Sequence, residues 1–110
     1  MSIKFEKWDK TWDIWFEISS YNYGGGLAIE MICEEEYGPE PFATLTVNLE
    51  DFPTEGNNAF VDINNLSDEI VDWLIANNLG EMTGRIGFSG FCAYPEIAFN
   101  LDEIKKHVKE

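Results

Sequence analysis

The sequence predicts an α+β domain, in which a mostly antiparallel sheet of about five strands has two helices packed on one face. Several segments alternate apolar and polar residues with the period of two that is typical of half-buried strands. Glycine- and proline-rich stretches separate these segments as hairpin turns would, and two other segments begin with helix-capping residues. Because the chain has 110 residues and 45% of them are hydrophobic, we expect a single folded domain over residues 1–110.

The first half of the chain is predicted to consist of strands. Residues 1–10 are expected to form an arm before a strand at residues 11–20, which is rich in aromatic and β-branched side chains although its aromatics also fit helical spacing. Three glycines at 24–26 predict a turn and a return strand at residues 27–33. Residues 34–41 are expected to form an exposed acidic turn, because their two prolines exclude a helix or a central strand. A third strand is predicted at residues 42–49.

The second half is predicted to alternate helix and strand. A short strand at residues 59–63 leads to Ser67, which is a good N-cap for a helix that runs to about Asn78, with Gly80 as its stop. Residues 83–91 are expected to form a close-packed loop, followed by a strand at residues 92–99. Asn100 can cap a final helix over residues 101–110, whose lysines suit its C-terminal end.

Negative charge dominates the body of the chain. Residues 11–104 contain eighteen acidic residues and one base, Arg85, and the whole chain has a net charge of −14. Such a field repels nucleic acids and anionic membranes and attracts a basic protein surface, which is the partner that we expect. The alternative is that the charge only keeps a hydrophobic domain in solution. The charged N-terminus resembles no secretory signal, so a cytoplasmic location is expected.

Acidic residues in two turns are the candidate partner-binding face. If these turns are adjacent, their carboxylates would imitate the phosphates of DNA, and the protein would be a DNA mimic. The predicted face consists of Glu34, Glu35, Glu36, Glu40, Glu50, Asp51 and Glu55.

A glycine-rich segment is the second candidate site. Gly84, Gly87 and Gly90 recur every third residue beside Arg85 and Ser89. Backbone amides in such a segment can form a nest for a phosphate or a carboxylate. The alternative is a purely structural connection in which Arg85 pairs with one of the many carboxylates.

Catalytic and metal-binding patterns fail at specific positions. The stretch Gly87-Phe88-Ser89-Gly90 resembles a nucleophile elbow but has Phe91 where the second glycine is needed. One histidine, His107, and two distant cysteines are too few for a structural zinc site. We therefore expect no enzyme, no metal and no cofactor.

The tryptophans near the N-terminus leave two interpretations open. On a strand, Trp12 and Trp15 face opposite sides, so they cannot both lie in one core with Trp8. Either some of them pack under the N-terminal arm, or they form an exposed aromatic patch. Such a patch with an acidic rim would be a docking surface for a basic protein or the seam of a homodimer.

Four stretches together resemble a known family: NYGGGLA at residues 22–28, PFATLTVN at 41–48, NAFVDINN at 58–65, and TGR at 83–85 with SGFCAYP at 89–95. They resemble a domain of unknown function found in small uncharacterised proteins of Gram-positive bacteria and their plasmids, conjugative elements and phages. The resemblance implies no activity and no catalytic residues. It implies an accessory role on a mobile element, acting against host defence or controlling transfer; the tryptophan-rich start departs from the pattern.

Together these observations predict an acidic, non-enzymatic accessory factor that binds a basic host or element-encoded protein, as a DNA mimic or an anti-defence inhibitor. The alternative function is a small-ligand or anion-binding module centred on the Arg85 segment.

Overall fold

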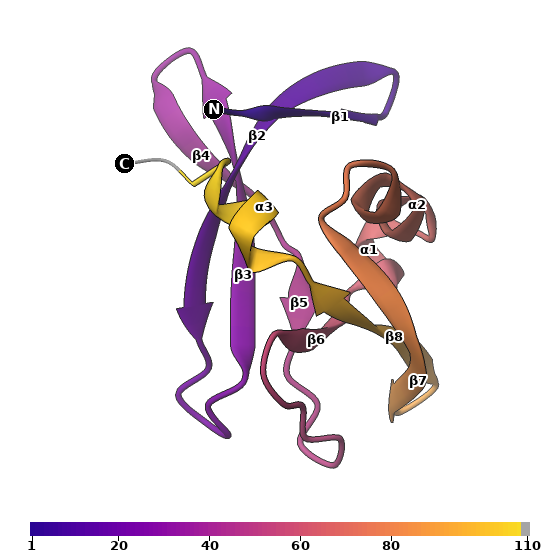
Figure 1. Ribbon diagram of the computed structural model, residues 1–110. Coiled ribbons are helices and arrows are strands. Elements are labelled where there is room, and N and C mark those ends of the chain that lie inside the picture. Colours follow the sequence, from indigo (N-terminus) through magenta and orange to yellow (C-terminus); the bar gives the residue numbers. More distant parts are fainter. Residues whose placement is uncertain (109–110) are drawn as a thin grey trace.

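The computed structural model describes residues 1–108 and contains two four-stranded antiparallel sheets with three short helices (Figure 1). The predicted α+β class is confirmed, but the single sheet of about five strands with two helices was wrong. The elements in chain order are β1 (Ile3–Lys7), β2 (Lys10–Ser20), β3 (Leu27–Glu35), β4 (Gly38–Thr44), β5 (Thr46–Val47), β6 (Asn58–Val61), α1 (Ile63–Leu66), α2 (Glu69–Ala76), β7 (Gly80–Ser89), β8 (Cys92–Phe99) and α3 (Leu101–Lys105).

The first sheet is an antiparallel meander in the order β1-β2-β3-β4. The segment expected to be an arm contains β1, because Phe5 pairs with Trp12 of β2 and is buried in the core. Trp8 and Asp9 form the tight turn between β1 and β2, both with positive φ as a two-residue hairpin loop requires. The predicted glycine turn before β3 is confirmed: β2 and β3 pair antiparallel, and the amide of Tyr21 donates to the carbonyl of Gly26 at 2.8 Å.

The end of β3 and the edge strand β4 replace most of the predicted acidic turn. Its prolines Pro39 and Pro41 are tolerated because β4 has a neighbour on one side only, so the missing N–H groups leave no ladder bond unmade. The strand predicted at residues 42–49 is interrupted at Leu45, where the chain passes into the second sheet. The amide of Leu45 donates to Ile29 at 2.9 Å, and its carbonyl accepts from Asp62 at 3.0 Å, so Leu45 connects both halves of the molecule.

The second sheet has the order β5-β6-β8-β7. The loop predicted at residues 83–91 was wrong, because most of it is the edge strand β7, which pairs with β8 from Gly80 to Ser89 with a bulge between Met82 and Ile86. Gly84, in the bulge, has φ +91°, a conformation that favours glycine.

The helices are shorter than predicted. Instead of one helix from Ser67, α1 is capped by Asp62, whose carboxylate accepts from the amide of Asn65 at 3.2 Å, and Ser67 joins α1 to α2. The predicted cap of the last helix is confirmed, since Asn100 accepts from the amide of Glu103 at 3.4 Å. That helix ends at Lys105, and its predicted extension through residues 109–110 lies outside the described residues.

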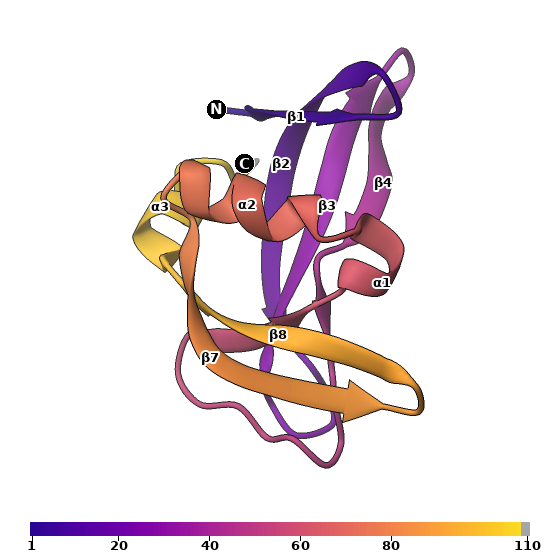
Figure 2. The ribbon, with the colours of Figure 1, turned by 90° about the vertical axis from the view of Figure 1, so that its right-hand side faces the viewer.

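The main core lies between the two sheets and is closed by α2 and α3 (Figures 1 and 2). The indole of Trp73 on α2 donates to the carbonyl of Lys4 on β1 at 2.7 Å, which ties the helix to the first sheet. A smaller cluster of Leu49, Phe60 and Tyr94 lies on the opposite face of the second sheet, away from the main core. Within residues 1–108, no helix is long and apolar enough to cross a membrane.

Candidate binding site

Arg85 forms an internal network with the buried carboxylate of Glu96. The guanidinium Nη1 donates to Glu96 Oε2 at 3.0 Å and to the carbonyl of Pro53 at 2.7 Å. The other oxygen of Glu96 accepts from the hydroxyl of Thr83 at 2.7 Å, and Glu96 is only 4% exposed. The guanidinium also lies 5.4 Å from the centre of the Phe60 ring. This arrangement joins the β7 bulge to β8 and to the loop between β5 and β6.

The glycines near Arg85 each have a structural place. Gly84 forms the bulge and Gly90 the turn to β8, while Ser89 pairs with Cys92 at the end of the strand. Gly87 faces the smaller cluster, where a Cβ atom would lie 2.5 Å from Leu49 Cδ1 and 2.9 Å from the Phe60 ring. Because the amides belong to a strand and a hairpin turn, the geometry supports the structural alternative over an anion nest.

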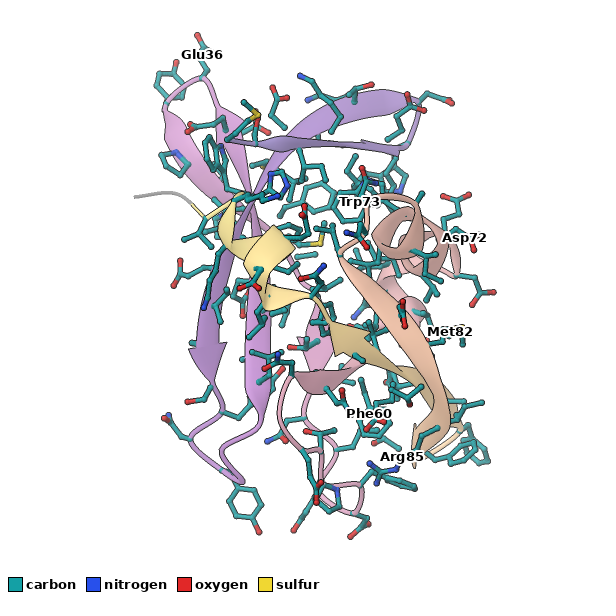
Figure 3. All side chains as sticks on the ribbon, viewed as in Figure 1. Glu36, Phe60, Asp72, Trp73, Met82 and Arg85 are labelled. Carbon is teal, nitrogen blue, oxygen red and sulfur yellow. The ribbon has the colours of Figure 1, made fainter. Side chains whose placement is uncertain are left out.

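The predicted acidic face is divided between two ends of the molecule. Residues 34–40 belong to the β3–β4 hairpin, with Glu36 at the top of Figure 3. Glu50, Asp51 and Glu55 lie in the loop between β5 and β6, at the opposite end in Figure 1. The molecule measures 40 Å along its longest axis, so the expectation that these turns are adjacent was wrong. The cause is the crossing at Leu45, which sends the chain from one sheet to the other.

A surface other than the two predicted sites exposes several apolar side chains to solvent. A groove of about 310 Å³ lies between the two helices α1 and α2 and the face of the β7–β8 hairpin opposite the smaller cluster; helices and hairpin lie one above the other in Figure 2. Met82 and Ile86 of β7 are 53% and 48% exposed. We call this surface the α2–β7 groove; it is lined by Ile63, Asp68, Val71, Asp72, Met82, Ile86, Ala93 and Pro95.

Strand alternation produces the apolar wall of the groove. Because Gly87 faces the smaller cluster, the side chain of its neighbour Ile86 lies on the opposite face, in the groove, whereas the ring of Phe88 packs against Phe52. Pro95 lies directly opposite Ile86, at a point where β8 has lost its pairing with β6, so its missing N–H is tolerated. This face of the hairpin therefore presents the apolar side chains of Met82, Ile86, Ala93 and Pro95 to the groove.

Carboxylates form the rim of the groove. Helix α2 buries Ile70, Val71 and Leu74 in the core; Val71 also lines the groove, with Asp68 and Asp72 beside it. Figure 3 shows Asp72 and Met82 on the same side of the molecule. Asp68 and Asp72 are the only charged residues of the lining, and the one arginine is engaged with Glu96.

The described lysines lie on β1, at the start of β2 and at the C-terminal end of α3. Lys4 pairs with Asp13, and Lys106 pairs with Glu103. Trp8 is 71% exposed and contacts Trp12 and Phe42, and Lys10 Nζ lies 4.0 Å from the centre of the Trp12 ring. Glu6, Asp9 and Glu69 share the surface around Trp8 with Lys7 and Lys10, so the expected acidic rim contains both signs of charge.

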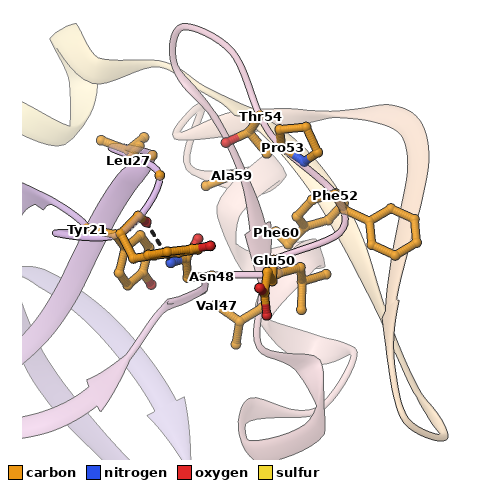
Figure 4. A pocket seen from close by; sticks show the side chains of 14 residues that line it. Tyr21, Leu27, Val47, Asn48, Glu50, Phe52, Pro53, Thr54, Ala59 and Phe60 are labelled. Atoms are coloured by element: carbon orange, nitrogen blue, oxygen red, sulfur yellow. Dashed lines mark hydrogen bonds between the residues drawn. The ribbon is translucent and has the colours of Figure 1, made fainter.

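The pocket shown in Figure 4 is too small for a metabolite. It lies between the β2–β3 turn and residues 47–54, has a volume of about 80 Å³, and is lined by Tyr21, Asn48 and Phe60 among others. The hydroxyls of Tyr21 and Thr46 are 2.7 Å apart. Burial raises the pKa of the Tyr21 phenol, and the carboxylates of Glu30 and Asp62 raise it further, against the opposing effect of the Thr46 bond. About three water molecules would fill such a space.

No nucleophile–base pair forms from the sequence candidates. Ser89 lies at the tip of the β7–β8 hairpin, whereas His107 accepts or donates a 2.8 Å bond with the carbonyl of Met1. Cys33 and Cys92 are free thiols. Burial, together with a hydrogen bond to Glu35, raises the pKa of the Cys33 thiol. In the part of the chain that the structure describes, no three histidine, cysteine or acidic side chains are grouped to hold a metal ion.

Comparison with known proteins gives one match, to a protein family. No match was found among curated proteins or among solved structures. The resemblance to an uncharacterised domain family, inferred from the glycine, proline and arginine stretches, is confirmed by a family model that covers most of the chain. The protein belongs to the family described as Domain of unknown function (DUF4313), which matches residues 15–110.

Proposed function

We propose that this protein is an acidic, non-catalytic binding factor that docks a basic protein in the α2–β7 groove. One observation carries the proposal. Exposed apolar side chains line a concave surface whose only charged residues are carboxylates, on a chain with a net charge of −14.

Both parts of the surface contribute to such binding. Burial of Met82 and Ile86 would supply a dry centre, since apolar area removed from water stabilises a complex by about 25 cal/mol per Å². Asp68 and Asp72 at the edge would pair with lysine or arginine of the partner. The acidic field of the whole chain would accelerate the encounter at low ionic strength.

The position of the carboxylates favours docking over DNA mimicry. A mimic presents carboxylates in a continuous series at phosphate-like spacing, whereas the predicted acidic residues are divided between the β3–β4 hairpin and the loop before β6. The anion-binding alternative has no comparable support, because the arginine is bonded to Glu96 and Pro53. The partner in this proposal is a basic host or element-encoded protein in the cytoplasm, and the implied role is one against host defence or in control of transfer.

The test compares two variants with the same type of substitution at exposed apolar positions. Met82→Glu/Ile86→Glu places charge in the groove, and Tyr37→Glu places it at the remote β3–β4 turn, where Tyr37 is 92% exposed. Each tagged protein is cross-linked in a lysate of the source cell at low salt, and recovered proteins are identified by mass spectrometry. We expect one basic protein to be recovered with wild type and Tyr37→Glu and to be lost with the groove variant. Equal recovery with all three proteins, or recovery of no basic protein, would refute the proposal.

A further inference from the structure

We propose that the occupant of the α2–β7 groove is an extended, basic segment of the partner that pairs with β7 as an additional strand. This inference rests on the proposed function and names the chemistry of the partner. The segment would be apolar at alternate positions and would bear lysine or arginine between them.

The edges of the two sheets differ in how they are protected. Exposed strand edges are usually blocked by proline, lysine, shortness or distortion. Strand β4 has Pro39 and Pro41, β1 has Lys4 and Lys7, and β5 has only two residues.

Strand β7 has the least of this protection. It is ten residues long, contains no proline or lysine, and directs its one arginine to Glu96. Its bulge distorts residues 83–85 only, so that Ile86 to Ser89 runs regularly along β8. Within residues 1–108, β7 pairs with β8 alone, which leaves its other side available for a strand.

Exposed apolar side chains are concentrated on this strand. Among residues 1–108, nine large hydrophobic side chains are exposed, and four of them belong to β7 or to the turn that follows it: Met82, Ile86, Phe88 and Phe91. Such a concentration on an unpaired edge is typical of a strand-addition site, where backbone hydrogen bonds supply affinity and alternate side chains supply specificity.

The groove determines the side-chain pattern of the added strand. Side chains of neighbouring strands share a face, so every second residue of the segment would lie over the groove beside Ile86. These positions require apolar side chains. The residues between them would face the opposite side of the sheet, where the carboxylates of Glu50 and Asp51 share a surface with Ser89, so lysine or arginine is favoured there.

A second copy of this chain fits the same edge less well. Pairing of β7 with β7 would bring together two chains that each have a net charge of −14, with four carboxylates from Asp68 and Asp72 near one interface. A basic segment removes this repulsion and gains attraction, so the charge favours it over a homodimer.

The probe is a blocked heptapeptide of alternating lysine and valine, Lys-Val-Lys-Val-Lys-Val-Lys, titrated to millimolar concentration into isotope-labelled protein. We expect the largest amide shift changes at residues 86–89 and cross-strand NOEs between peptide and β7. Two further peptides are N-methylated at alternate residues: the first at the residues whose N–H groups point to one edge of the strand, the second at the residues whose N–H groups point to the other edge. At least one of them should lose about tenfold in affinity, because a methylated edge cannot donate to β7. Ile86→Glu should abolish binding, and Tyr37→Glu should leave it unchanged.

The outcomes separate this inference from the proposed function. If both methylated peptides bind as tightly as the parent and still shift the groove residues, strand pairing is refuted while docking in the groove stands. If the parent peptide shifts no groove residue, both proposals fail. If the free protein sediments as a dimer that Ile86→Glu dissociates, the basic occupant is refuted in favour of a second copy.

Discussion

Truncation of Arg85 separates the structural role of this residue from the anion-binding alternative. Arg85→Ala removes the bonds to Glu96 and Pro53 and leaves the carboxylate of Glu96, 4% exposed, with the hydroxyl of Thr83 as its remaining partner. Breaking a fully buried ion pair costs about 3–5 kcal/mol. The Arg85 side chain is 42% exposed, so water can reach the vacated position. We therefore expect a loss of about 2 kcal/mol in the free energy of unfolding.

The assay is urea denaturation combined with thermal melting. A loss of about 2 kcal/mol corresponds to a fall of about 9 °C in Tm for a domain of this size. In a Glu96→Gln background, where a neutral amide replaces the buried carboxylate, the same truncation should cost about 1 kcal/mol, and the double-mutant cycle should show coupling of about 1 kcal/mol. An unchanged Tm in Arg85→Ala, together with loss of a stabilisation by inorganic phosphate that wild type shows, would refute the structural role.

Three further predictions follow from the packing. Gly87→Ala should lower the free energy of unfolding by about 1–3 kcal/mol, because its Cβ would lie 2.9 Å from a buried ring. Urea titration should show a larger loss than for the control Gly84→Ala, whose Cβ meets no atom within 4 Å and is strained only by a φ of +91°. A larger loss for Gly84→Ala would contradict the packing at Gly87. Trp73→Phe should cost about 1 kcal/mol through loss of the bond to Lys4, measured in the same way, and an unchanged midpoint would show that this bond contributes nothing. Stability should fall as the pH rises above about 8.5, because the unfolded chain releases the Cys33 proton there while burial raises the pKa of the folded thiol, so that the folded state binds more protons until its own pKa is reached. Cys33→Ala should reduce that slope in urea titrations between pH 8 and pH 10, and an identical slope would assign it to other groups.

Local patterns in the sequence determined the fold class and several boundaries. Alternation predicted β2, β3 and β8, the three glycines predicted the turn between β2 and β3, and Asn100 predicted its own cap. These features depend on neighbours along the chain, which is why they can be inferred without coordinates. The structural alternative for Arg85 was also accessible, because a lone arginine among eighteen acids has many possible partners. The sequence does not identify Glu96 as that partner.

Tertiary structure alone decided where the candidate surface lies. Strand β7 was hidden because Gly84, Gly87 and Gly90 lower strand propensity, and its pairing with β8 overrides that preference. The crossing at Leu45 depends on bonds to Ile29 and Asp62, which are distant in sequence, and it separates acidic turns that appear adjacent along the chain. The groove is lined by residues that lie between positions 63 and 95 of the sequence. Their exposure depends on which sheet edge remains unpaired. Periodicity identifies the face of a strand, but only long-range pairing determines which face and which edge are left open to a partner.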